Sequence, residues 1–129
     1  MNVYILEDEL THHKRISNIF SKVQGHMKSL FPSLFYFETV EKLLASKVLF
    51  KENDVFILDI DIHGNKKAGL QLASMLRRQF EHVTIIFLTA HGSLIKDIFG
   101  HRAFPLDFID KSLSDEEIIE RLILCFTYV

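Results

Sequence analysis

Residues 54–61 have the sequence Asp-Val-Phe-Ile-Leu-Asp-Ile-Asp, in which an apolar run ends in acids. A short apolar run bounded by polar residues is typical of a strand that is buried on both faces of a sheet. Residues 3–6 (Val-Tyr-Ile-Leu) repeat the pattern and are followed by Glu7 and Asp8. Residues 83–88 (Val-Thr-Ile-Ile-Phe-Leu) form the clearest predicted strand of the chain. Three nearly apolar strands of this kind indicate a parallel sheet covered by helices.

The rest of the chain alternates between strand and helix patterns. Two more strands are predicted at residues 33–39 and 106–109. Apolar residues at helical spacing predict five helices, at residues 10–23, 40–50, 70–80, 93–99 and 114–126. Strict alternation of strands and helices predicts one α/β domain, a doubly wound five-stranded parallel sheet with five helices.

Composition excludes several classes of protein. A length of 129 residues suits one compact domain, and a net charge of −2 gives no basic excess for binding nucleic acid directly. No apolar run approaches the ~20 residues of a transmembrane helix, so we expect no membrane span and a cytoplasmic location. The single cysteine, Cys125, is expected to be a buried, inert thiol. The seven histidines show no zinc-binding spacing, and most are expected on the solvated surface.

Chemically complementary side chains follow four of the predicted strands. In doubly wound sheets, ligands bind at the carboxyl ends of the strands, near the switch in strand order. The residues at these ends are an acid pair, a further set of acids, a hydroxyl with its neighbour, and an amine: Glu7 and Asp8, Asp59 and Asp61, Thr89 and Ala90, and Lys111. With strand order 2-1-3-4-5 the first and third strands are neighbours, so Glu7, Asp8 and Asp59 converge.

Convergence of three carboxylates has an energetic consequence. Two carboxylates about 4 Å apart repel by roughly 4 kcal/mol at an effective dielectric of about 20. Three such pairs would remove much of a stability of about 5–15 kcal/mol, so the cluster needs protons or a cation. Oxygen ligands suit Mg²⁺ (or Mn²⁺), and Lys111, Thr89 and the backbone N–H of Ala90 suit phosphoryl oxygens. Asp59 is then a nucleophile able to form an aspartyl phosphate.

These residues carry a family resemblance. The segments Ile-Leu-Glu-Asp (5–8), Phe-Ile-Leu-Asp (56–59), Phe-Leu-Thr-Ala (87–90) and Asp-Lys (110–111) resemble the motifs of response-regulator receiver domains, which have the CheY/flavodoxin-like fold. The resemblance covers residues 1–129, so any DNA-binding output domain is expected outside them. Residues 58–64 (Leu-Asp-Ile-Asp-Ile-His-Gly) look closest to receivers of the AgrA/ComE type, pheromone-sensing regulators with a LytTR domain.

The resemblance implies a role for each matching position. Asp59 is the expected phosphoacceptor of a sensor histidine kinase. Glu7, Asp8, Asp59 and the backbone carbonyl of Asp61 are the expected metal ligands. Thr89 and Ala90 are expected at the phosphoryl group, and Lys111 is expected to pair with it. Thr89 and Phe108 are the expected switch, whose movement makes the chain a homodimer and acts on DNA through an output domain. The chain is then a phosphorylated switch rather than an enzyme.

The sequence also departs from the family pattern and leaves one alternative open. Ser112 stands where receivers commonly have proline, so a cis bond after Lys111 is in doubt. Asp59-Ile60-Asp61 also resembles the Asp-x-Asp motif of haloacid-dehalogenase-type phosphatases, in which Asp59 is the nucleophile and Asp61 the general acid. That alternative leaves Glu7 and Asp8 without a function.

Overall fold

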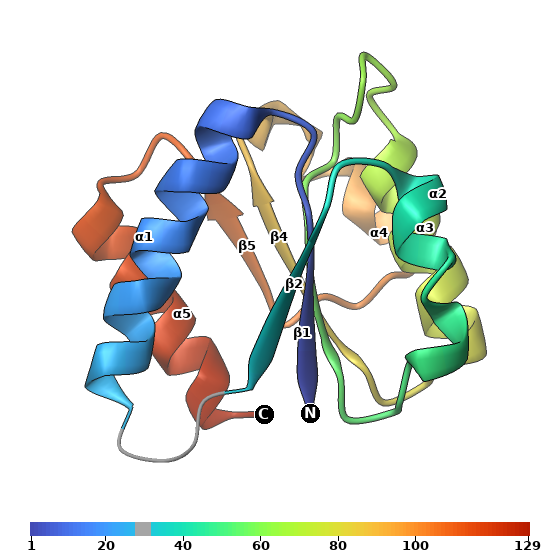
Figure 1. The fold of residues 1–129 in the computed structure, drawn as a ribbon. Coiled ribbons are helices and arrows are strands. Elements are labelled where there is room, and N and C mark those ends of the chain that lie inside the picture. The colour runs from blue at the N-terminus through green and yellow to red at the C-terminus, as the bar shows by residue number, and fades with distance from the viewer. Residues whose placement is uncertain (28–31) are drawn as a thin grey trace.

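Five strands and their connecting helices form a three-layered molecule (Figure 1). The computed structural model describes residues 1–27 and 32–129. The strands are β1 (Asn2–Leu6), β2 (Ser33–Phe37), β3 (Val55–Leu58), β4 (Thr84–Thr89) and β5 (Asp107–Asp110). The α-helices are α1 (Leu10–His26), α2 (Val40–Leu44), α3 (Ala68–Gln79), α4 (Asp97–His101) and α5 (Asp115–Thr127). Two 3₁₀ turns, η1 (Lys47–Leu49) and η2 (Gly92–Leu94), lie between them.

The sheet is entirely parallel, with the strand order β2-β1-β3-β4-β5 that the sequence predicts. Helices α1 and α5 cover one face, and α2, α3 and α4 cover the other (Figure 1). Because neighbouring side chains of a strand point to opposite faces, Val3 and Ile5 join the core under α1 and α5, while Tyr4 and Leu6 join the other core. The central strand β3 is buried along its whole length.

Two predicted helices differ from the observed ones. The helix expected at residues 40–50 ends at Leu44 and is followed by η1, in which Val48 is 89% exposed. The helix expected at residues 93–99 is the turn η2 followed by α4. Apolar spacing in such short segments does not separate a helix from a string of turns, because burial of one or two side chains satisfies either.

The strand expected at residues 33–39 ends at Phe37, because Thr39 caps the next helix. Its side chain accepts a hydrogen bond of 3.0 Å from the backbone N–H of Lys42. A capping box begins the last helix, with Ser114 and Glu117 bonded to each other's backbone N–H.

The connection after β3 is held close to the sheet by a glycine. A Cβ on Gly69 would lie 1.8 Å from the carbonyl oxygen of Asp59, so only glycine lets α3 begin there. The connection contains a turn at residues 62–65, closed by two hydrogen bonds between the backbones of Ile62 and Asn65, with Gly64 at φ +79°. In the described parts of the chain, every helix is too short or too polar to cross a lipid bilayer.

Candidate functional site

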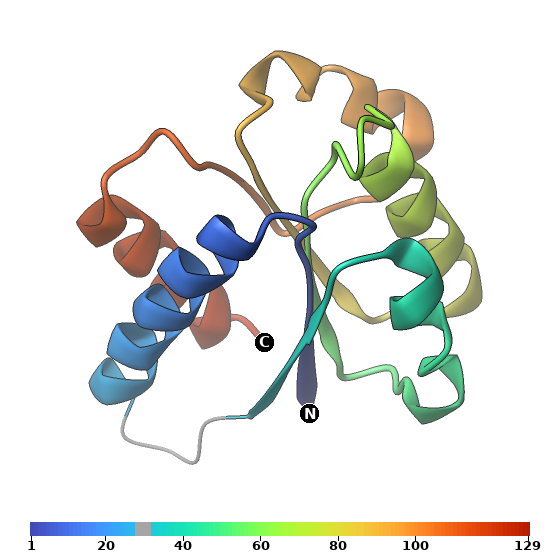
Figure 2. The same cartoon turned by 45° about the horizontal axis from the view of Figure 1, so that its top comes forward.

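The polar residues that follow the strands meet at the carboxyl edge of the sheet, which is turned toward the viewer in Figure 2. Leu6 lies beside Leu58 in the register of β1 and β3, and the N–H of Asp59 donates to the Leu6 carbonyl at 3.1 Å. The same register therefore places Glu7 beside Asp59. On the other side, the N–H of Lys111 donates to the carbonyl of Thr89 at 2.9 Å.

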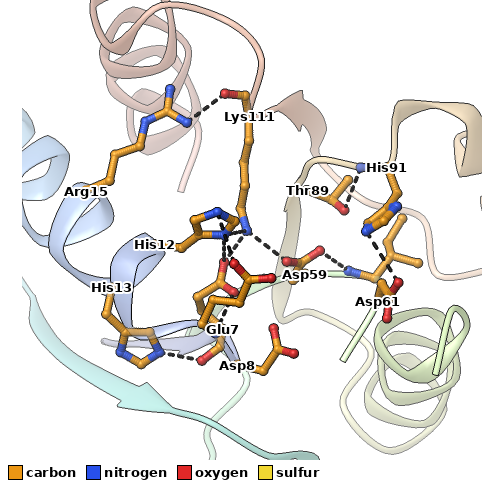
Figure 3. A network of polar contacts seen from close by, with 12 residues as sticks. Glu7, Asp8, His12, His13, Arg15, Asp59, Asp61, Thr89, His91 and Lys111 are labelled. Carbon is orange, nitrogen blue, oxygen red and sulfur yellow. Dashed lines mark hydrogen bonds and ion pairs between the residues drawn. The ribbon is translucent and has the colours of Figure 1, made fainter. Parts of the chain in front are cut away.

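The ammonium group of Lys111 lies at the centre of the site (Figure 3). It donates to Asp59 Oδ2 at 2.8 Å, to Glu7 Oε1, and to His12 Nδ1 at 3.1 Å. Lys111, Glu7 and Asp59 are all buried, at 7%, 1% and 5% exposure. An ammonium has three N–H groups and no acceptor, so all three of its donors have partners.

The two buried carboxylates can carry two negative charges, whereas the Lys111 ammonium that faces them carries one positive charge. Burial raises the pKa of Glu7; Lys111 opposes this shift and the neighbouring Asp59 adds to it, with the net pKa above 4.5. A raised pKa means that the folded protein disfavours this negative charge in spite of Lys111. Oxygen donors with a surplus of negative charge fit a hard divalent cation such as Mg²⁺.

Asp8 lies beside this buried pair and is more exposed. Burial would raise its pKa, but the backbone N–H of His63 and a side-chain contact with Glu7 lower it below 3.8. The His63 N–H donates to Asp8 Oδ2 at 2.8 Å. Asp8 therefore stays charged at the mouth of the site, next to Glu7.

Thr89 and Asp61 lie on the side of the site opposite Lys111 and share a neighbour (Figure 3). Thr89 is fully buried, and its Oγ1 accepts a hydrogen bond of 3.2 Å from the backbone N–H of His91. The ring of His91 lies 3.4 Å from Asp61 Oδ2. The hydroxyl of Thr89 can still donate, since a hydroxyl carries one O–H besides its lone pairs. Ala90 follows directly and is exposed.

Phe108 lies between the core and the surface. Its ring centroid is 6.1 Å from that of Phe87, and the residue is partly buried. It also lines a cavity of about 470 Å³ on the outside of α4 and β5, together with Ile98, Phe99 and Leu106. Phe108 therefore contacts both the core and this cavity.

Two residues of α1 belong to the site although they were not predicted from the sequence. Most of the histidines were expected on the solvated surface, and His12 is an exception, because its ring lies against Glu7 and Lys111 with 33% of the side chain exposed. Arg15 donates to the carbonyls of Lys111 at 2.7 Å and Leu113 at 2.9 Å, and to Asp115 Oδ1 at 2.8 Å. A signal exists only in hindsight: both lie on the polar side of α1 nearest its first turn.

The bond between Lys111 and Ser112 is trans, since the described residues contain no cis peptide bond. Ser112 instead donates its N–H to Asp110 Oδ1 at 2.8 Å. The loop after β5 is thus fixed by Arg15 and Asp110 in place of a proline. Cys125 is buried as expected, and burial together with the nearby Asp107 raises the pKa of its thiol to about 12.

Comparison with known proteins gives one consistent answer. The family model "Response regulator receiver domain" matches residues 3–123. Nodulation protein W of Bradyrhizobium diazoefficiens is 23% identical over 121 residues, which are 94% of this chain and 49% of that protein. Sensory transduction protein LytR of Staphylococcus saprophyticus is 30% identical over 117 residues, 91% of this chain and 41% of that protein. The chain thus spans half or less of these relatives.

Solved structures show the same fold. The response regulator TrrA of Thermotoga maritima, in complex with Mg²⁺ and beryllofluoride, superposes with a TM-score of 0.69 at 23% identity, covering 95% of this chain and 96% of that one. The family match across residues 3–123 and the strand order agree with the arrangement of the site. The chain belongs to the response regulator receiver domain family and is a receiver domain of a two-component signalling system.

Proposed function

We propose that Asp59 accepts a phosphoryl group from a sensor histidine kinase, with Mg²⁺ (or Mn²⁺) held by Glu7, Asp8, Asp59 and the carbonyl of Asp61. The observation that carries the proposal is the buried contact of 2.8 Å between Asp59 Oδ2 and Lys111 Nζ, beside a second buried carboxylate. In phosphoryl transfer the protein mainly positions the groups and neutralises charge, and this cluster supplies both.

The transfer follows from the groups present. A carboxylate oxygen of Asp59 attacks the phosphorus atom of the kinase's phosphohistidine; the new P–O bond forms as the P–N bond breaks, and the released imidazole takes up a proton. Lys111, already within hydrogen-bonding distance of Asp59, neutralises charge on the transferred oxygens. The N–H of Ala90 and the hydroxyl of Thr89 donate to the same oxygens. A bound divalent cation supplies further charge neutralisation.

The output is a change of surface. A phosphoryl group on Asp59 draws the hydroxyl of Thr89 toward it and away from the backbone of His91, with which it now bonds at 3.2 Å. The vacated space lets the ring of Phe108 pack inward, which changes the apolar cavity on α4 and β5. The altered face then pairs with a second copy of the chain, as a two-state element biased by a local charge.

The proposed output of the switch is the control of transcription. Two LytR proteins are among the relatives, and this chain covers 41% of each. This supports an output domain of the LytTR type in the full regulator, through which alone the protein contacts DNA. The described residues of the receiver contribute the switch and the dimer contact.

A small phosphodonor tests the central step. Acetyl phosphate with Mg²⁺ is expected to add one phosphoryl group to the chain, detected by intact-mass spectrometry. Asp59→Asn abolishes this label, whereas Asp110→Asn, an acid at the same edge of the sheet, keeps it. Equal labelling of the Asp59→Asn and wild-type proteins refutes the assignment. Sustained hydrolysis of p-nitrophenyl phosphate that needs both Asp59 and Asp61 supports the phosphatase alternative instead.

The switch has its own test. Beryllofluoride with Mg²⁺ is expected to shift the wild-type chain from monomer to dimer in sedimentation-velocity experiments. Thr89→Ala is expected to keep the label but lose most of this shift. If Thr89→Ala dimerises at the same protein concentration as the wild-type chain, the proposed role of Thr89 is refuted.

A further inference from the structure

One imidazole enters the acidic site from helix α1. His12 Nδ1 lies 3.1 Å from Lys111 Nζ and 3.4 Å from Glu7 Oε1 (Figure 3). One ligand atom each from Glu7, His12 and Asp59 all lie within 4.8 Å of one another. Neither the phosphoryl transfer nor the switch proposed for this chain uses this ring, and 33% of the side chain is exposed to solvent.

The contact with Lys111 indicates which ring nitrogen of His12 carries no proton. An ammonium can only donate, so His12 Nδ1 accepts and carries its lone pair toward the centre of the site. Glu7 and Asp59 also direct oxygen lone pairs at the same ammonium. Three electron-pair donors thus already converge on one positive charge, and an unprotonated imidazole nitrogen is the form that binds metals.

The distance between two of the three ligand atoms suits a small divalent ion. Two ligands that each lie about 2.1 Å from a tetrahedral ion are about 3.4 Å apart. The 3.4 Å between Glu7 Oε1 and His12 Nδ1 meets this requirement. The other ring nitrogen, Nε2, faces Glu9 Oε2 at 3.5 Å. Histidine ligands commonly place their second nitrogen against a carboxylate in this way, which fixes the orientation of the ring.

The nitrogen changes which ion is preferred. Mg²⁺ is bound by oxygen atoms and keeps several waters, whereas Zn²⁺ takes nitrogen and oxygen ligands in tetrahedral sites. Three protein ligands and one water complete such a site. Among first-row divalent ions, affinity for mixed nitrogen and oxygen ligands is higher for Zn²⁺ than for Mn²⁺.

We propose that Glu7, His12 and Asp59 form a second cation site, for an imidazole-accepting divalent ion such as Zn²⁺, which displaces the Lys111 ammonium. The site shares Glu7 and Asp59 with the magnesium site, so the two ions exclude each other. Zinc also separates the Lys111 ammonium from Asp59 and excludes Mg²⁺, so the zinc-loaded chain does not accept a phosphoryl group. This inhibitory effect rests on the proposed function, whereas zinc binding does not.

A competition titration of Zn²⁺ against a chromophoric chelator measures binding. We expect His12→Gln to weaken zinc binding at least about tenfold, because even the loss of a residue that only orients a metal ligand costs roughly 10–100-fold. His26→Gln is the matched control, since His26 is an exposed histidine at the far end of the same helix, and its ring contacts the backbone carbonyl of Lys22. Magnesium affinity is expected to be the same in both variants.

A second variant tests the displacement. Lys111→Met removes the competing ammonium and is expected to raise zinc affinity, while His12→Gln lowers it. Visible spectra of the Co²⁺-loaded wild-type protein are expected to show the intense bands of tetrahedral nitrogen and oxygen coordination, and His12→Gln to lose them. Equal zinc affinities of the His12→Gln and His26→Gln proteins overturn the proposal and show that zinc binds elsewhere.

Labelling separates the two proposals. With acetyl phosphate and Mg²⁺, added Zn²⁺ is expected to suppress phosphorylation of the wild-type chain and to have little effect on His12→Gln. A wild-type chain that binds zinc through His12 but is never labelled refutes the proposed function and leaves the zinc site intact. Normal labelling of the wild-type chain, together with equal sensitivity of His12→Gln and wild type to zinc, supports the proposed function and refutes the zinc site.

Discussion

Replacing Lys111 by methionine tests whether the cluster at the centre of the site is held together by charge. The side chain keeps its length and apolar stem but loses the ammonium between Glu7 and Asp59. At 2.8 Å and an effective dielectric of about 20, the attraction to Asp59 alone amounts to about 6 kcal/mol. Desolvation of the ammonium offsets part of this. Removing one partner of a buried ion pair costs about 3–5 kcal/mol, and that is the loss of unfolding free energy we expect.

The pH dependence of this loss follows from Glu7. Its folded pKa already lies above 4.5, so its protonation contributes stability below that pH, and this contribution is lost as pH rises through the folded value. Without Lys111 the folded pKa rises further. The deficit of Lys111→Met is therefore expected to be largest at neutral pH and to shrink on acidification toward pH 4.5.

Urea denaturation followed by circular dichroism, at several pH values, measures these free energies. Adding Glu7→Gln to Lys111→Met removes one of the two stranded charges and is expected to recover part of the stability at neutral pH. The control double variant combines Glu41→Gln with Lys111→Met. Glu41 is an acid in the first turn of α2, so this change is expected to recover no stability. A loss below about 1 kcal/mol for Lys111→Met, or no recovery with Glu7→Gln, refutes the electrostatic account.

Three further outcomes are expected. Arg15→Ala removes two hydrogen bonds to the loop after β5 and one to Asp115 at the start of α5, so it should lower unfolding free energy by about 1–3 kcal/mol in urea titrations and slow phosphodonor labelling, unlike exposed Arg78→Ala. With a pKa of about 12, only about one Cys125 in a thousand is thiolate at pH about 9, so iodoacetamide should label the native chain far more slowly than the urea-unfolded chain; equal rates contradict burial. Burial would raise the pKa of Asp107, but Arg121 lowers it below 3.8. Asp107→Asn should therefore lower the unfolding free energy by about 0.5–1 kcal/mol in urea titrations above about pH 3.8. This loss should vanish as the pH falls through the pKa of Asp107 in the folded protein.

The sheet and the acidic centre were predictable because they depend on short-range patterns. A parallel strand that ends in an acid places that acid at the carboxyl edge, whatever the details of helix packing. The sequence therefore predicted that Glu7, Asp59 and Lys111 meet, and the hydrogen bonds of Lys111 confirm that they do. Asp8 was expected in the same cluster, and it lies beside Glu7, bonded to the backbone of His63.

The remaining features depend on how elements dock. The apolar stripe of α1 identifies the face that packs on the sheet, but it does not determine which polar residues reach the loop after β5. That depends on the angle between α1 and α5, which pack side by side. His12 and Arg15 were missed for this reason. The helix expected at residues 40–50 was wrong for a different reason: the chain leaves α2 after Leu44 and forms η1, whose C-cap Phe50 is extended and buried.

Helix α1 holds Lys111 at both ends. Arg15 binds the backbone carbonyl of Lys111 at 2.7 Å, and His12 accepts from its ammonium at 3.1 Å. The two residues are three apart on one helix and so lie on the same side, about one turn from each other. A shift of α1 relative to β5 therefore changes the contacts at both ends of the lysine. In this chain the position of α1 and the charge balance around Asp59 are coupled, because one helix contacts both the backbone and the ammonium group of Lys111.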